Sequence, residues 1–87
     1  FIKLDVDGHE LDVLKSGEKF LKNRKPVIFI EIAPYLYPEF GYQCSELITY
    51  IKNLKYFFYS EDLKKIVNIN NYIKKITYGG SENFYLM

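Results

Sequence analysis

Hydrophobic and polar positions follow a strand-type pattern and a helix-type pattern in turn along the first third of the chain. Apolar runs at residues 1–6 and 27–30 predict two strands, and the second, rich in β-branched side chains and ending near Glu31, is typical of a strand buried on both faces. Over residues 9–22, apolar residues recur at helical spacing, with acids near the start and basic residues near the end. These elements predict a right-handed β-α-β unit with parallel strands.

The second part of the chain continues the alternation with a loop and a helix. Residues 33–43 carry two prolines, a glycine and three tyrosines, which predicts a loop. Ser45 is a suitable N-cap for the helix that follows. The expected buried stripe of this helix is Leu47, Ile48, Ile51 and Leu54.

The last third predicts two more strands with a less regular segment between them. Residues 56–59 favour a third strand and residues 83–87 a last one. Between them, residues 66–69 favour a short strand, and a short helix starting at Asn70 or Asn71 extends through Ile76. The predicted fold class is therefore α/β, with a mostly parallel sheet and an antiparallel strand at its edge.

Composition narrows the possible partners and surroundings. The 87 residues suit one small domain or part of one, and the net charge of +1, with Arg24 as the only arginine, gives no electrostatic case for nucleic acid. The clearest apolar run, residues 26–30, is far shorter than the roughly 20 residues that span a bilayer. The lone Cys44 forms no internal disulfide or zinc site, which fits a reducing compartment and predicts a cytoplasmic protein.

Acidic residues mark the ends of the first two strands. Asp5 and Asp7 are two positions apart, so they point the same way if the strand persists, and Gly8 allows a sharp exit from it. Ligands of α/β proteins bind at the carboxyl ends of strands, where Glu31 also lies. The residues alone leave other roles open, because Asp7 is also suited to cap the following helix and Glu10 to favour its dipole.

Three segments, residues 1–10, 14–17 and 27–32, resemble the C-terminal half of the FkbM-type methyltransferases. In that family the stretch that corresponds to residues 3–10 commonly reads Lys, apolar, Asp, apolar, Glu, Gly, any residue, Glu; here Asp7 stands where Glu is usual. The resemblance implies a Rossmann-like fold that binds S-adenosylmethionine and methylates an oxygen of a small molecule or sugar. It also implies that residues 1–87 are the C-terminal part of one methyltransferase domain. The glycine-rich loop and the acid that grip the cofactor lie upstream, so this chain alone is expected to be inactive.

The resemblance suggests a role for each candidate residue. Asp5 and Glu31 are the expected catalytic residues, and Asp5 and Asp7 the expected cofactor contacts. Glu10 and Tyr35 are the expected contacts to the acceptor. No metal ligands are predicted.

Two other functions compete with this prediction. The run Asp5-Val6-Asp7-Gly8 also matches the opening motif of haloacid-dehalogenase-like phosphatases, which use magnesium. Against it, His9 stands where that family has Thr or Ser, and a helix follows at once where that family has a flap. The second alternative is a non-catalytic remnant or interaction module whose acids only cap helices.

Overall fold

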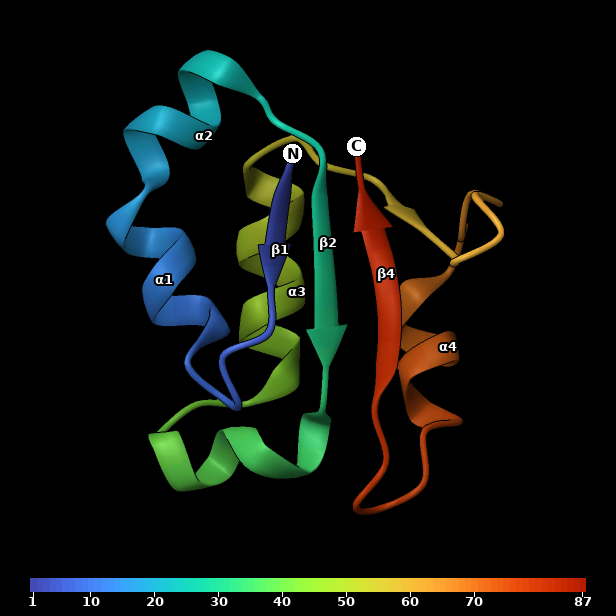
Figure 1. Ribbon diagram of the computed structural model, residues 1–87. Coiled ribbons are helices and arrows are strands. Elements are labelled where there is room, and N and C mark those ends of the chain that lie inside the picture. The colour runs from blue at the N-terminus through green and yellow to red at the C-terminus, as the bar shows by residue number, and fades with distance from the viewer.

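Four strands form one mixed sheet in the computed structural model, which describes residues 1–87. The strands are β1 (Ile2–Leu4), β2 (Ile28–Ile32), β3 (Phe58–Tyr59) and β4 (Glu82–Leu86). Their order across the sheet is β1-β2-β4-β3 (Figure 1). Only β1 and β2 pair in parallel, and β4 runs antiparallel to both of its neighbours.

The α/β prediction is thus confirmed, but the expected sheet is wrong in two respects. It is not mostly parallel, and the antiparallel strand β4 lies inside the sheet instead of at its edge. The reason is that β4 pairs along all five residues of β2, with Ile28 opposite Leu86 and Ile32 opposite Glu82. The two-residue strand β3 is left to the edge.

The helical segments are α1 (Glu10–Ser16), α2 (Glu18–Arg24), the 3₁₀ helix η1 (Pro34–Phe40), α3 (Cys44–Asn53) and α4 (Ile69–Lys74). The single helix expected over residues 9–22 is therefore wrong. It is divided at Gly17, which has a low helix propensity and lies between α1 and α2. None of these helices has the length and apolar character needed to cross a membrane.

Three local expectations also need correction. The loop predicted at residues 33–43 is largely η1. The N-cap of α3 is Gln43 and not Ser45, and no side chain caps that helix. The strand predicted at residues 66–69 is absent, because Asn68 starts α4 there by accepting a hydrogen bond from the Asn71 amide at 3.2 Å.

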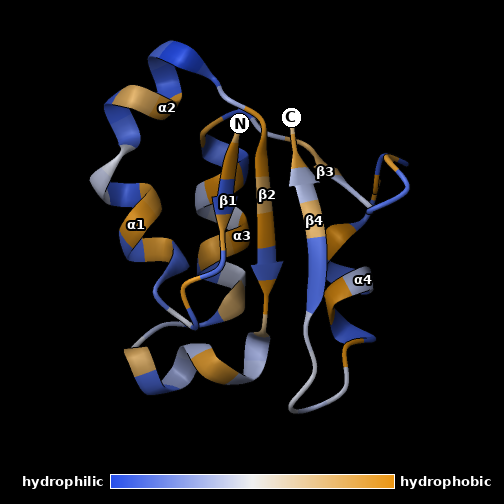
Figure 2. Cartoon of the chain, viewed as in Figure 1, coloured by the Kyte–Doolittle hydropathy of each residue, from blue (hydrophilic) through white to orange (hydrophobic).

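The two faces of the sheet differ in burial. The face toward α3 and α4 carries the apolar core, and alternate residues of β2 and β4 are fully buried there: Ile28, Ile30, Ile32, Phe84 and Leu86. On the opposite face Phe29 and Tyr85 pack against each other at 4.8 Å between ring centroids but stay half-buried. The expectation that the second strand is buried on both faces is therefore wrong. Figure 2 shows a polar patch where the carboxyl end of β2 meets the start of β4.

Candidate active site

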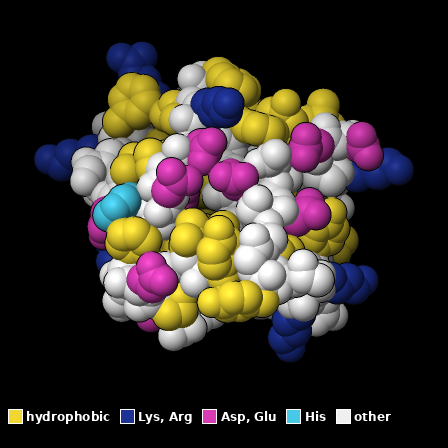
Figure 3. Space-filling view, turned by 60° about the horizontal axis from the view of Figure 1, so that its bottom comes forward, with side chains coloured by type: hydrophobic (Ala, Val, Ile, Leu, Met, Phe, Trp, Pro, Cys, Tyr) yellow, Lys and Arg dark blue, Asp and Glu magenta, His cyan; other side chains and the backbone are white.

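Three carboxylates gather at the carboxyl ends of β1 and β2. Asp5 directly follows β1, Asp7 lies in the next turn, and Glu31 is the fourth residue of β2. One carboxylate oxygen from each lies within 4.8 Å of the others. Because β1 and β2 are parallel, their carboxyl ends meet at one edge of the sheet, which Figure 3 shows with acidic side chains gathered around a hollow. We call Asp5, Asp7 and Glu31 the acidic cluster.

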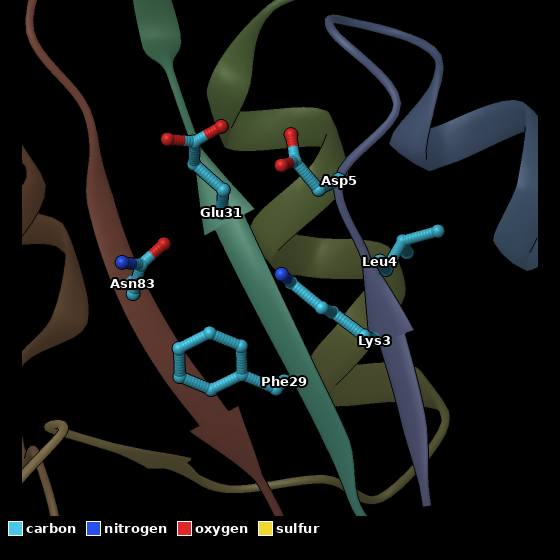
Figure 4. A pocket seen from close by; sticks show the side chains of 6 residues that line it. All are labelled: Lys3, Leu4, Asp5, Phe29, Glu31 and Asn83. Carbon is cyan, nitrogen blue, oxygen red and sulfur yellow. The ribbon is translucent and has the colours of Figure 1, made fainter.

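A small cavity of about 130 Å³ adjoins the acidic cluster on the open face of the sheet. Its lining consists of Lys3, Leu4, Asp5, Phe29, Glu31 and Asn83 (Figure 4). The side chain of Lys3 extends into the space between β1 and β2, below the two carboxylates. The cavity has room for a group of a few atoms or a few water molecules.

Opposing influences act on the pKa of Glu31. The hydroxyl of Ser81 donates a hydrogen bond to Oε2 of Glu31 at 2.9 Å, which lowers the pKa. Hydrogen bonding to Asp5, burial and the charges of Asp5 and Asp7 act the other way, and together they raise the pKa above its ordinary value. A carboxyl group with a raised pKa is a better proton acceptor when it is ionised.

The loop that carries Asp5 and Asp7 is held by Glu10. This side chain is only 2% exposed, and its two oxygens accept hydrogen bonds from the backbone amides of Val6 and Gly8, both at 3.1 Å. The carboxylate of Glu10 thus faces the loop backbone, and Glu10 is not a member of the acidic cluster. Its contact with an acceptor stays a prediction, while its position in the structure is that of a residue that shapes the site.

The expectation that Asp7 caps the first helix is wrong. The N-cap of α1 is His9, and no side chain donates or accepts a capping hydrogen bond there. Asp7 has a left-handed backbone with φ of 49°, which turns it into the acidic cluster. Glu10 takes over the neighbouring amides, so the side chain of Asp7 is not needed for capping.

Two aromatic residues from after β2 close over the same loop. The hydroxyl of Tyr42 donates a hydrogen bond to the carbonyl of Gly8 at 2.6 Å. The ring of Phe40 lies so close to Gly8 that a Cβ atom there would stand 2.3 Å from Cε2 of Phe40. Burial is the main cause that raises the pKa of Tyr42 to about 12, so this hydroxyl keeps its proton. The sequence placed Tyr42 among the loop tyrosines but predicted neither of these contacts with Gly8, and Phe40 was not singled out; the one signal was the glycine, which allows a close approach to the backbone.

Tyr35 lies on η1, away from the lining of the small cavity. Tyr35 is 37% exposed, and its ring meets the ring of Tyr78 at 5.7 Å between centroids. The predicted residues therefore divide into three sets. Asp5, Asp7 and Glu31 come together, Glu10 lies beneath them, and Tyr35 lines a separate groove.

The fold and the acidic cluster define an α/β protein with polar groups at the strand ends where such folds bind ligands. Residues 1–58 match the family model described as the methyltransferase FkbM domain. This match covers 58 of 87 residues, and the chain therefore belongs to the FkbM methyltransferase family, as the sequence resemblance predicted. Neither a curated protein sequence nor a solved structure was found to match the chain.

Proposed function

We propose that the acidic cluster is part of the active site of an S-adenosylmethionine-dependent methyltransferase that acts on an oxygen of a small molecule or sugar. The observation that carries the proposal is the meeting of Asp5 and Glu31 at the ends of two parallel strands, in a chain of methyltransferase type. The family match supports methyl transfer, and the chemistry of the cluster supports the assignment of roles.

The cluster has the charge that a cationic cofactor requires. S-adenosylmethionine carries its reactive methyl group on a sulfonium cation. None of the three carboxylates forms an ion pair with a lysine or arginine. They outnumber Lys3, the one lysine that lines the adjoining cavity, so the net potential of the cluster stays negative. We assign Asp5 and Asp7 to cofactor contacts, because both are exposed at the edge of the sheet.

The remaining parts of the cofactor need more surface than the small cavity offers. A volume of about 130 Å³ is below the roughly 300–1,000 Å³ of a typical ligand pocket. We therefore propose that the chain forms the C-terminal part of a methyltransferase domain and that a preceding half supplies most of the cofactor site. The partly exposed sheet face around Phe29 and Tyr85, and the edge of β1 that pairs with no other strand, support this arrangement.

Glu31 is the best candidate for the base. Methyl transfer to a hydroxyl is faster when a positioned group takes the hydroxyl proton as the oxygen attacks. Glu31 has a raised pKa and lies beside a cavity large enough for the reacting groups. In this scheme its carboxylate takes the proton, Ser81 orients that carboxylate, and Asp5 orients the reactants from the adjoining strand.

The test measures transfer of a radiolabelled methyl group from S-adenosylmethionine to sugars and small alcohols by the intact protein. We expect Glu31→Gln to lower kcat about 10²–10⁴-fold, and Asp5→Asn also to weaken cofactor binding. Asp12→Asn is the matched control, because Asp12 is an exposed acid of α1 outside the cluster. Unchanged turnover in both cluster variants would remove these carboxylates from the mechanism. Magnesium-dependent hydrolysis of p-nitrophenyl phosphate, without methyl transfer, would instead support the phosphatase alternative.

A further inference from the structure

A second, larger groove lies between η1 and the segment that joins α4 to β4. Its volume is about 500 Å³, within the range of pockets that bind small molecules. One wall carries Tyr35 and Glu39, and the other carries Thr77 and Tyr78. Both segments lie at the lower end of the molecule in Figure 1, toward which β1 and β2 run.

A hydrogen bond joins the two walls to the acidic cluster. Pro34, the first groove residue, comes three positions after Glu31, and Ser81 comes three positions after Tyr78. Ser81 donates its hydroxyl hydrogen to Glu31 at 2.9 Å. Since an extended chain advances about 3.3 Å per residue, the Cα atom of Pro34 lies within about 10 Å of that of Glu31, and the Cα atom of Tyr78 within about 10 Å of that of Ser81. This short separation supports a role for the groove beside Glu31.

The side chains of the groove combine aromatic faces with hydrogen-bonding groups. Tyr78 is 92% exposed and Tyr35 is 37% exposed, so ring surface is open to a ligand. The two rings contact each other at a tilt of 59°, with centroids 5.7 Å apart, so a ligand packs on their outer faces and not between them. A sugar ring has C–H groups that pack on the negative face of a tyrosine, and hydroxyl groups that the carboxylate of Glu39 and the hydroxyl of Thr77 can bind.

We propose that this groove is a carbohydrate subsite that holds a pyranose ring against Tyr78 and Tyr35. Its role as the acceptor subsite rests on the proposed methyltransferase function, because it presents a sugar hydroxyl toward Glu31. The binding of the sugar itself needs neither the cofactor nor methyl transfer.

The experiment is an NMR titration of the ¹⁵N-labelled protein with methyl glycosides of glucose, galactose, mannose and rhamnose. We expect at least one glycoside to cause saturable amide shifts in residues 34–39 and 76–81, and Tyr78→Ala to weaken this binding about tenfold or more. Tyr78 is almost wholly exposed, so the variant should keep the dispersed spectrum of the folded protein. Phe57→Ala is the matched control, because Phe57 is an exposed aromatic residue (55%) outside the groove, and it should leave binding unchanged.

Three results would overturn the proposal. They are the absence of saturable shifts with all four glycosides, shifts that Tyr78→Ala leaves unaltered, and tighter binding of phenol than of any glycoside at the same residues. A protein that transfers methyl groups but gives one of these results keeps the proposed function and uses another acceptor site. A protein that binds a glycoside through Tyr78 but transfers no methyl group keeps the subsite and loses the proposed function.

Discussion

Replacement of Glu10 tests whether its buried carboxylate holds the loop of the acidic cluster. In Glu10→Gln one carboxylate oxygen becomes an NH₂ group. This group faces the backbone N–H of Val6 or Gly8 and cannot accept the hydrogen bond that the oxygen accepted. A hydrogen bond to a charged group contributes about 1.5–3 kcal/mol, and a buried donor without a partner costs a similar amount. We therefore expect the free energy of unfolding to fall by about 1.5–3 kcal/mol.

The assay is urea unfolding followed by circular dichroism, at 0.15 M salt. Asp12→Asn is the control, because Asp12 shares the first turn of α1 and its effect on the helix dipole but is exposed. Loss of a dipole interaction alone costs about 0.3–1 kcal/mol at low salt and less under these conditions. If Glu10→Gln destabilises the protein no more than Asp12→Asn, the two backbone hydrogen bonds do not stabilise the loop and our reasoning is refuted.

Three further predictions concern the surroundings of the cluster. Gly8→Ala should lower the free energy of unfolding by about 1–3 kcal/mol, because φ is 104° and the new Cβ would meet Phe40. In urea unfolding, adding Phe40→Ala should relieve the steric part of this loss but not the backbone strain. If the effects of Gly8→Ala and Phe40→Ala on the free energy of unfolding simply add, the contact is contradicted. The pKa of Glu31 is raised on folding, so the protein loses stability as pH rises through that pKa. Glu31→Gln should therefore raise Tm at pH 7, and the difference in Tm between variant and wild type should vanish below about pH 4.5. A difference in Tm that stays constant with pH in thermal melts would argue against this. Burial raises the pKa of Cys44 to about 11, so iodoacetamide at pH 8 should alkylate the folded protein on the order of a hundredfold more slowly than the urea-unfolded protein. Equal rates would contradict the raised pKa of this partly buried thiol.

Local periodicity predicted the elements better than their arrangement. The helix with its apolar stripe at Leu47, Ile48 and Ile51 is α3, and these three residues are buried as expected. The position of β4 was predicted within one residue, because the alternation around Phe84 and Leu86 is local. Its place between β2 and β3 depends on pairing with residues more than 50 positions earlier in the chain, such as Ile28, and no short-range pattern encodes that choice.

The same division holds for the candidate site. The meeting of Asp5 and Glu31 follows from the rule that parallel strands end at one edge, so the sequence alone could predict it. The part that Glu10 plays could not be predicted, because a first-turn acid satisfies the helix dipole whether its side chain faces water or turns back to the loop. Tyr42 reaches Gly8 across 34 positions, a contact that only the folded chain creates.

The position of β4 also has a consequence for the order of folding. Strand β4 joins β2 to β3, so before it pairs these strands exist only as the β1–β2 pair and a separate two-residue segment. The fully buried side chains of Phe84 and Leu86 then complete the core in the same step. Synthesis runs from the N-terminus, so the edge of β2 that pairs with β4 stays unpaired until residues 82–86 emerge from the ribosome. Until β4 arrives, this edge of β2 is open to pairing with another chain.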